Sequence, residues 1–548
     1  LVGSEMCIRD RTYINRLIER GHKVAICEQV EDPKKAKGLV KREVVRIVTP
    51  GTTLDAAALD ETKNNYLMSI VSMEEHFGCA IADITTGDCF LTEVDKPQKL
   101  LDEINKFVPA EIICNDSFYM SNIDTDDLQN RLGICVFSLD SWYFDDELCR
   151  RTLKEHFHVG SLEGLGVGDY DCGIIAAGAL FLYLKETQKT ALSHMATIRP
   201  YAAEKYMLID SSSRRNLELV ETLREKQKRG SLLWVLDKTR TAMGARLLRT
   251  WIEQPLLSSD AINHRLDAVE SLVNQTVQRG DLIEELHYIA DLERMMTRTV
   301  YGSATPKEIY AMAQTCERLP SLRQQAESCG CAELSEIVSR IDPLSDIKDK
   351  IYAAVDPDAP STLKDGGVIA KGYHPEVDEL RSIRDNTKGV LAQLETRLRQ
   401  ETGIPKLKIG YNHVFGYFIE VSNSYKQMVP ETYIRKQTLV NGERYITQEL
   451  KDLEHDILSA SDRVSALEYE LFTRLRQELS GHVARIQATA AAVAEADCLC
   501  SLAAVAVKNN YCCPVVDDSG VIEIHDGRHP VVERVLKDAL FVPNDTYM

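Results

Sequence analysis

The sequence of 548 residues lacks any unbroken apolar run that approaches the roughly 18 to 20 residues of a membrane span, and it opens without a convincing secretory signal. It also lacks net positive charge, because 65 basic residues are set against 84 acidic ones and the net charge is −19. This balance excludes a histone-like polycation, although one basic face can sit on an acidic body. We therefore expect a cytoplasmic chain without a membrane partner.

Motifs for metal binding and disulfide pairing are missing as well. The 15 cysteines are scattered through apolar runs without a Cys-x-x-Cys pair, and the 13 histidines lack the His-Glu-x-x-His context of a zinc enzyme. We predict that the cysteines are reduced and mostly buried small hydrophobic residues, and we expect no metal site.

Catalytic motifs are also absent from the sequence. Gly164, Gly166 and Gly168 precede an apolar helix, but the Lys-Ser/Thr that completes a phosphate loop does not follow them. There is no complete Walker A motif, no Gly-x-Ser-x-Gly and no pair of catalytic carboxylates supported by a motif. We therefore predict no catalytic residue, and a chain that binds and transmits rather than one that catalyses.

The chain does contain an ordinary globular mixture of 44% hydrophobic and 27% charged residues, which at roughly 150 residues per domain predicts three to five domains. Residues 1–11 fit nothing that follows and are interpreted as non-native. From residue 12, a helical stripe is stopped by Gly21, and strands are predicted at 24–27 and 44–48.

Residues 66–195 alternate between strand and helix patterns, which predicts an α/β domain. The predicted strands are 66–71, 79–84, 89–94 and 111–114, with a tight turn at 86–88 and helices at 97–107 and 172–184. The helix at 97–107 leads into the strand at 111–114, which is a βαβ-like step.

Residues 210–388 turn helical. The clearest start is Thr305-Pro-Lys-Glu308, a capping box with proline at the first helical position. After it, apolar residues recur at helical spacing and are predicted to form a buried stripe of Ile309, Met312, Cys316 and Leu319.

Near residue 405 the apolar period changes from helical to two. Strands are predicted at 407–411 and 417–421, and Asn441-Gly442 is the dipeptide that best suits a type I′ hairpin between 438–440 and 444–446. A helix with a coiled-coil-like seam follows at 450–471, then a break at 480–481 and an alanine-rich helix at 484–508. The pattern predicts long helices that carry a β-insert at their far end.

Positive charge collects in this insert. Residues 404–451 hold seven basic and four acidic residues in a chain that is acidic overall. Basic and amide groups on a hairpin suit contact with the DNA backbone, and the alternative is a solvated hairpin face. A second basic stretch carries the same two interpretations: Lys34, Lys35, Lys37, Lys41, Arg42 and Arg46.

Several strings in collinear order over residues 12–548 resemble the MutS family of bacterial DNA mismatch-repair proteins. They are Lys23–Pro33, Val44–Thr52, Arg214–Leu219, Val235–Leu248, Gly410–Ile419, Gln437–Leu439, Glu443–Ile446 and Gly527–Val532. The resemblance implies a multidomain α/β plus all-α architecture with a domain order. The expected domains are the C-terminal part of a mismatch-binding domain (12–52), an RNase-H-like connector (60–195), core and lever helices (196–387), a β-rich clamp (388–448), returning core and lever helices (449–511) and the beginning of an ABC-type ATPase domain (512–548).

The resemblance and the charge pattern together single out two sets of side chains. The clamp is expected to contact DNA through Lys408, Asn412, His413, Lys426, Arg435, Lys436, Gln437 and Asn441. The adenine side of a nucleotide site is expected at Phe541, Val542 and Asn544. Asp83 in the connector is interpreted as non-catalytic, because it lacks the companion carboxylates of a two-metal nuclease.

The family implies a DNA mismatch-repair sensor that clamps duplex DNA and, in the intact protein, couples mismatch recognition to ATP binding and hydrolysis. The expected partners are double-stranded DNA, a second copy of the chain and a MutL-type repair protein, in the nucleoid-associated cytoplasm. The mismatch-wedging Phe-x-Glu is expected upstream of Tyr13 and the Walker motifs downstream of Met548. We therefore expect a fragment to which ATP and Mg²⁺ do not bind tightly.

Two other functions fit the same residues. One is a MutS-like paralogue that clamps DNA junctions without reading mismatches, although such paralogues tend to lack the domain of residues 12–52. The other is a coiled-coil scaffold that binds no DNA, which would show no salt-dependent binding to heteroduplex.

Overall fold

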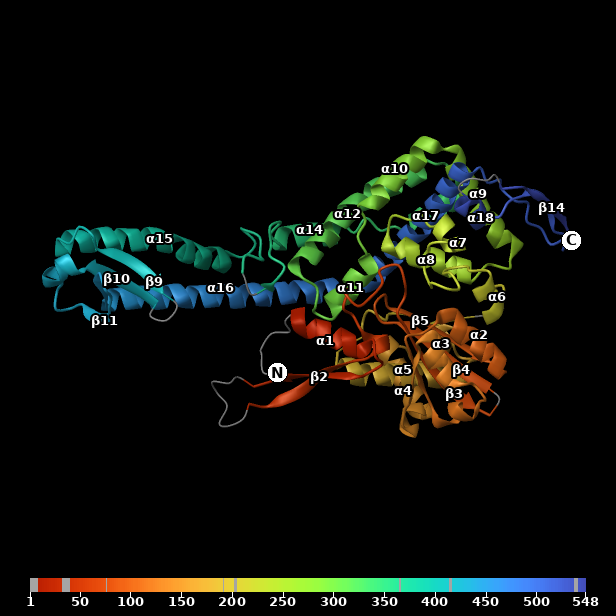
Figure 1. The fold of residues 1–548 in the computed structure, drawn as a ribbon, viewed down its shortest axis with the longest axis horizontal. Helices are drawn as coiled ribbons and strands as arrows, with labels where there is room; N and C mark the ends of the chain where they lie inside the picture. Colours follow the sequence, from red (N-terminus) through yellow and green to blue (C-terminus); the bar gives the residue numbers. More distant parts are fainter. Residues whose placement is uncertain are drawn as a thin grey trace. The chain divides into compact units, whose positions relative to one another are not determined.

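The computed structural model describes residues 8–31, 40–74, 76–190, 192–201, 205–363, 366–412, 416–536 and 541–548 (Figure 1). They form two compact units. The first unit comprises Leu1–Ala304, Gln314–Ser345 and Leu479–Met548, and the second comprises Thr305–Ala313 and Asp346–Glu478. Both helices and sheets are present, so the coarse expectation of a multidomain α/β and helical protein is confirmed.

The first unit opens with helix α1 (Ile8–Ile18) and a two-stranded antiparallel sheet of β1 (Val24–Gln29) and β2 (Arg42–Val48). After the helix, the chain turns at Gly21, which has a φ of 79°, a conformation that glycine adopts at little cost. The predicted helix end and both predicted strands are therefore confirmed. Lys34, Lys35 and Lys37 lie outside the described residues.

A six-stranded sheet follows, with the order β7-β6-β3-β4-β5-β8. Its strands are β3 (Tyr66–Met73), β4 (His76–Asp83), β5 (Asp88–Val94), β6 (Glu111–Cys114), β7 (Cys135–Ser138) and β8 (Arg199–Pro200). Strands β3 to β5 form an antiparallel meander, whereas β6 runs parallel to β3 and β7 parallel to β6. The predicted βαβ-like step is therefore real, but its helix α2 (Pro97–Phe107) leads from β5 across the sheet to the far side of β3.

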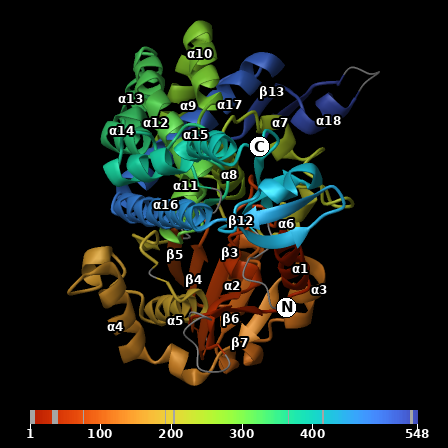
Figure 2. The same cartoon turned by 90° about the vertical axis from the view of Figure 1, so that its left-hand side faces the viewer.

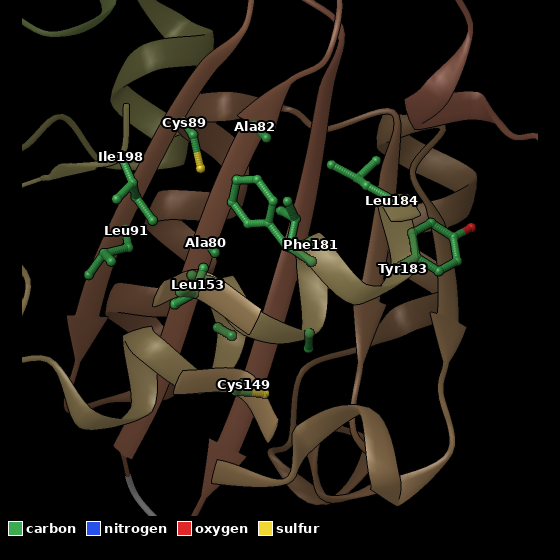
Figure 3. Packing of buried hydrophobic residues seen from close by; sticks show 14 of the residues in the cluster. Ala80, Ala82, Cys89, Leu91, Cys149, Leu153, Phe181, Tyr183, Leu184 and Ile198 are labelled. Carbon is green, nitrogen blue, oxygen red and sulfur yellow. The ribbon is translucent and has the colours of Figure 1, made fainter. Parts of the chain in front are cut away.

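Helices cover both faces of this sheet (Figure 2). Helices α4 (Asp146–Phe157) and α5 (Asp171–Gln188) pack on one face, where Phe181 lies over the strand that carries Ala80 and Ala82 (Figure 3). Helices α2 and α3 (Thr125–Leu132) pack on the other face through residues such as Leu100. A fully buried side chain of this size contributes about 1.5 to 3 kcal/mol to folding.

Glycines set how closely α5 approaches the sheet and the neighbouring helix α4. A Cβ added at Gly78 of β4 would lie 2.1 Å from the carbonyl oxygen of Cys172, and one added at Gly178 of α5 would lie 2.2 Å from the Cβ of Cys149. No side chain fits at either contact, so both positions require glycine.

Nine of the fourteen cysteines in the described part of the chain are buried, as predicted from their apolar surroundings.

The rest of the first unit is mostly helical. The helices from residue 211 to residue 354 are α6 (Ser211–Asn216), α7 (Leu232–Leu236), α8 (Ala242–Glu253), α9 (Ser259–Asn274), α10 (Thr276–His287), α11 (Leu292–Val300), α12 (Pro306–Glu327), α13 (Ala332–Ser339) and α14 (Ser345–Ala354). The start of α12 and nearly all of α14 belong to the second unit. At the start of α12, the Thr305 N–H donates to Glu308 at 2.8 Å and the Glu308 N–H donates back to the Thr305 hydroxyl at 3.3 Å. The predicted capping box is confirmed, and the predicted stripe is fully buried.

Helix α17 (Val483–Asn509) is the central helix of this region and packs against α8, α9 and α11. By length and composition it could cross a membrane, but 67% of its most apolar window is buried inside the protein. The sequence predicted the helix itself at 484–508 but not its length of apolar surface, because Glu495 and Asp497 interrupt the apolar run. Asp497 accepts hydrogen bonds from the Arg240 N–H at 2.9 Å and the Thr241 N–H at 2.7 Å, so it ties α17 to the start of α8.

In the second unit, two long helices run antiparallel. They are α15 (Pro375–Thr402) and α16 (Gln448–Ser480), with ion pairs from Arg463 to Glu376 and from Arg381 to Glu468. The predicted helix break at 480–481 is confirmed, since α16 ends at Ser480.

Between α15 and α16 lies a four-stranded antiparallel sheet, the insert sheet, with the order β11-β12-β10-β9 (Figure 1). Its strands are β9 (Lys408–Asn412), β10 (Gly416–Ser422), β11 (Ile434–Thr438) and β12 (Gly442–Ile446), and the 3-10 helix η7 (Asn423–Met428) follows β10. Its inner face packs on α15 and α16, where Ile419 and Val421 meet Leu394, Leu398 and Leu450. The predicted β-insert is confirmed.

The hairpin turn of the insert sheet differs from the prediction. Leu439 and Gly442 close the turn through a 2.8 Å backbone hydrogen bond, so its two central residues are Val440 and Asn441. Neither of them, nor Gly442, has a positive φ, so the turn is not type I′. Glycine is needed at 442 for another reason, because a Cβ there would lie 2.6 Å from the carbonyl oxygen of Val421 in the neighbouring strand.

Candidate nucleic-acid interface

The outer face of the insert sheet, opposite α15 and α16, carries a row of polar side chains. Strand register places Lys408 opposite Glu420, Glu420 opposite Arg444, and Arg444 opposite Gln437. Residues that face each other across neighbouring strands project from the same side of a sheet. Four side chains from four strands therefore form one row across the sheet.

Arg444 is the fixed centre of this row. Its Nε lies 3.2 Å from a Glu420 carboxylate oxygen, and its NH1 donates to the Gln437 side-chain oxygen at 2.9 Å. Its guanidinium also lies 4.0 Å from the centre of the Phe418 ring, a favourable cation–π position. Because the Gln437 oxygen accepts from Arg444, the amide NH₂ of Gln437 remains to donate to a ligand. Arg444 was not singled out as a site residue from the sequence.

Two predicted site residues share one carboxylate. Lys426 Nζ lies 2.6 Å and Arg435 NH1 lies 3.3 Å from Oε1 of Glu443, whose Oε2 accepts from the Tyr445 hydroxyl. These hydrogen bonds, that from Lys426 foremost, lower the pKa of Glu443 to about 2. Glu443 is therefore ionised at neutral pH and offsets one of the two cations. The Lys426 and Arg435 side chains are still 53% and 60% exposed, so their other N–H groups face solvent.

Lys408 and Lys436 are the predicted cations with the most freedom. Both are exposed, and neither has an ion pair within the described residues. Lys436 lies at a β-bulge in β11, where the register with β12 shifts between Arg435 and Gln437. A bulge on an edge strand turns a side chain away from the regular pleat, so Lys436 projects independently of its neighbours.

Two further predicted clamp residues, Asn441 and Asn412, lie in the hairpin turn and at the end of β9. Asn441 is exposed in the hairpin turn, where its carbonyl oxygen accepts from the Asn423 N–H at 3.2 Å. Asn412 is half-buried at the end of β9 and pairs with Gly416. His413 lies outside the described residues.

Two described residues of the second basic stretch, Lys41 and Arg46, have partners within the protein. Lys41 is paired with Glu43 at 2.6 Å. Arg46 donates to the Gln188 side-chain oxygen at 3.0 Å and to the Thr52 carbonyl oxygen at 2.9 Å, so it connects β2 to α5. Arg46 therefore has a structural contact that the charge pattern alone does not reveal.

Asp83 of the connector also has structural contacts. Its fully buried carboxylate accepts from Asn64 Nδ2 at 2.9 Å, the Asn65 N–H at 3.0 Å and the Thr85 hydroxyl at 2.7 Å. Asp88 stands opposite it across the β4–β5 turn, a companion carboxylate that the sequence reasoning missed. Within the described ranges, no group of three or more His, Cys, Asp or Glu residues is placed to hold a metal ion.

The three residues expected near adenine lie in and before strand β14 (Asn544–Tyr547). This strand pairs with β13 (Glu523–Gly527), and the short helix α18 (Pro530–Val535) lies between them along the chain. Phe541 is half-buried, whereas Val542 is 74% exposed. Asn544 Nδ2 donates to the Val542 carbonyl oxygen at 3.1 Å, so this amide is engaged within the segment.

The described chain is thus a multidomain protein in which an α/β domain and a helical core are combined with a sheet inserted between two long helices. Family models for MutS domain I, MutS domain II and MutS domain III match residues 8–57, 65–196 and 212–503. The chain belongs to the MutS family, as the sequence strings predicted.

Curated relatives match almost the whole chain. It is 52% identical over 536 residues to the DNA mismatch repair protein MutS of Lachnoclostridium phytofermentans, which covers 98% of this chain and 58% of the relative. It is 46% identical over 545 residues to that of Alkaliphilus metalliredigens, covering 98% and 61%, and 46% identical over 536 residues to that of Symbiobacterium thermophilum, covering 97% and 61%. The chain therefore spans about three fifths of the length of these relatives.

Proposed function

We propose that this chain is the DNA-clamping body of a mismatch-repair sensor, which holds duplex DNA through contacts with the phosphate backbone. The observation that carries the proposal is the outer face of the insert sheet. It carries Lys408 on the edge strand β9 and the Gln437 amide on the opposite edge strand β11, with the fixed Arg444 in the row between them and Lys436 beside Gln437 at the bulge. Such donors bind phosphate oxygens without reading base sequence.

In the intact protein, this body couples mismatch recognition to ATP binding and hydrolysis. The relatives named above carry the words DNA mismatch repair in their names, and the match of MutS domain I to residues 8–57 favours a sensor over a junction-clamping paralogue. A second copy of the chain and a MutL-type protein are the proposed protein partners, in the nucleoid-associated cytoplasm.

The domain order implied by the family is proposed with the same function. An antiparallel meander of three strands with parallel strands added beyond β3 supports an RNase-H-like connector. The β13–β14 hairpin is proposed as the beginning of an ABC-type ATPase domain.

The described residues do not suit ATP and Mg²⁺ by themselves. Val542 is largely exposed, the Asn544 amide is engaged by its neighbour, and no phosphate-binding loop accompanies them in the described part of the chain. We therefore assign no hydrolytic step to this chain and expect no Mg²⁺-dependent ATP turnover from the pure protein.

Binding of labelled duplex DNA over a range of salt concentrations tests the proposal. We expect log K to fall linearly with log salt, with a slope of roughly −0.9 for each phosphate contacted. A coiled-coil scaffold that binds no DNA predicts no signal at any salt concentration, and that result would overturn the proposed function. The matched variants are given with the predictions below.

A further inference from the structure

The first unit contains a cavity of about 410 Å³ with an unusually basic lining. The walls come from the start of β3, the ends of α2, α3 and α8, the short helix α6 and the loop that follows it. Seven cationic and two acidic residues are among the described residues that line this basic cavity. The chain as a whole has a net charge of −19, so the local excess runs against its overall composition.

Part of this excess is neutralised behind the cavity wall. Lys106 is paired with Glu103 at 3.1 Å, and Arg131 with Asp127 at 2.9 Å. Five cations then remain against the two carboxylates of the wall, which is a net excess of three positive charges. Among the five, Lys226 and Arg215 are exposed at the cavity.

Two largely buried arginines in the wall have N–H groups without an acceptor, although Asp102 and Glu103 lie within electrostatic range of Arg214. The side chains of Arg214 and Arg249 are 11% and 16% exposed, and both approach the single carboxylate of Glu253, at 3.8 Å and 3.5 Å. Within the described residues, Nε and NH1 of Arg214 and Nε of Arg249 have no hydrogen-bond acceptor. Buried cationic groups are costly without an anionic partner, so a negative charge in the cavity would stabilise this pair.

Helix ends account for only some of these cations. Arg214 NH2 donates to the Glu253 carbonyl oxygen at 3.0 Å at the end of α8, and Lys226 Nζ donates to the Arg131 carbonyl oxygen at 3.2 Å near the end of α3. Each helix C-terminus is equivalent to about half a negative charge, so three of them offset about 1.5 positive charges. About half of the excess of three is left uncompensated.

We propose that the basic cavity binds a small multivalent phosphate anion, such as a di- or triphosphate chain. Arginine and lysine bind phosphate oxygens through charge-assisted hydrogen bonds, and the volume lies in the range of ordinary small-ligand sites. The walls join the six-stranded-sheet domain, through Lys63 and Lys106, to the helical core, through Arg214 and Arg249. The bound anion therefore ties these two parts of the first unit together.

Calorimetric titration of the 548-residue chain with inorganic tripolyphosphate, without Mg²⁺, tests this site. We expect one anion per chain and a rise in the thermal midpoint. Lys226→Gln and Arg215→Gln remove exposed cations and should each weaken binding about five- to ten-fold. The control is Lys154→Gln, which changes the net charge equally on an exposed position of α4 and should bind as the wild type does.

Two further arms make the outcome unambiguous. Lys408→Gln with Lys436→Gln removes cations of the insert sheet. If these changes weaken tripolyphosphate binding and Lys226→Gln does not, the anion binds the proposed DNA surface and the cavity site is overturned.

Titrations with ATP and AMP distinguish a free phosphate chain from a nucleotide as the ligand. Equal affinity for ATP and tripolyphosphate means that the phosphate chain alone is recognised, and tighter ATP binding adds a contribution from the base. No binding of tripolyphosphate, or binding of AMP alone, overturns the proposal. The salt-dependent DNA-binding assay tests the insert sheet, not the basic cavity. The proposed function is therefore judged by that assay, whatever the tripolyphosphate titration gives.

Discussion

Lys426 Nζ lies 2.6 Å from the carboxylate of Glu443, which also holds Arg435. One buried carboxylate therefore forms ion pairs with two of the cations that are predicted from the sequence to contact DNA. The pKa of Glu443, lowered to about 2 by these hydrogen bonds, means that any contribution of this cluster to stability is present above the ordinary glutamate pKa of about 4.3 and is lost only as the pH falls toward 2.

Glu443→Gln should strengthen duplex binding. The change keeps the shape of the side chain but removes the charge that offsets Lys426 and Arg435, so the salt slope of log K should steepen by up to about 0.9. Fluorescence anisotropy over a salt series measures both quantities. Glu431→Gln is the matched control, because this exposed acid lies on the same insert without an ion pair among the described residues. An equal gain from both variants would show that only net charge matters.

Replacing Arg435 and Lys436 with alanine should weaken binding uniformly across DNA sequences. Each lost phosphate contact should lower the salt slope by roughly 0.9. Since Lys436 has no ion pair with any described residue and Arg435 shares Glu443, Lys436→Ala should account for the larger part. The thermal midpoint should change little, because exposed charges contribute little to stability. Wild-type affinity and slope in the double variant would remove the clamp assignment, and unfolding would favour a structural role.

This chain should bind matched and mismatched duplexes about equally. Among the described residues, Phe418-Ile-Glu420 has the Phe-x-Glu spacing of the family's mismatch wedge but not the exposure that a wedge needs. Phe418 is only 6% exposed and lies under the Arg444 guanidinium, so it is not placed to enter a base stack. Competition between the two duplexes at one salt concentration measures the preference. A several-fold preference for the mismatch would mean that the described residues contain a reading element.

Arg381→Met should destabilise the second unit by about 3 to 5 kcal/mol, because it leaves the fully buried Glu468 carboxylate without its cation. Among the contacts of the described residues, Glu468 would retain only the hydrogen bond from the Val368 N–H at 3.0 Å. Arg463→Met is the control, since its side chain and that of Glu376 are 66% and 50% exposed and such pairs contribute about 1 kcal/mol or less. Urea unfolding compares them, and equal losses would contradict the prediction.

Asp497 should make stability depend on pH. Burial raises its pKa to about 6, although the hydrogen bonds from Arg240 and Thr241 act to lower the pKa. Because the folded pKa exceeds the unfolded one, the contribution of Asp497 is present below pH 4 and is lost as the pH rises to about 6, by roughly 3 kcal/mol. The difference in unfolding free energy between the wild type and Asp497→Asn should fall over that range and be flat above it. A constant difference would show that Asp497 has an ordinary pKa.

Local patterns in the sequence predict much of this fold. The capping box at Thr305, the strands of the six-stranded sheet from 66 to 114 and the two helices around residue 480 follow from residues close together in the chain. The short strands β7 and β8 were missed, because four and two residues give too little alternation to detect. The predicted type of the turn at Asn441-Gly442 was wrong. Glycine is needed at 442 because a neighbouring strand approaches closely, not because of the backbone conformation of the turn.

The site was less accessible to sequence reasoning. Positive charge near residues 404–451 drew attention to the insert sheet, but only the folded structure reveals that Glu443 holds two of the cations and that Arg444 lies over Phe418. The basic cavity gathers cations from residue 63 to residue 249, which no local pattern connects. Such sites depend on long-range packing.

The 33 residues of α16 contain neither proline nor glycine, so the helix is a stiff rod about 50 Å long. The insert sheet joins it through a single residue, Thr447, between β12 and α16. A rod of that length converts a tilt of about 5° at one end into a displacement of about 4 Å at the other. A small change in the direction of α16 at its C-terminal end therefore produces a larger displacement of the insert sheet. Conversely, a force on the sheet exerts a large torque at the C-terminal end of α16, because it acts over the whole length of the helix.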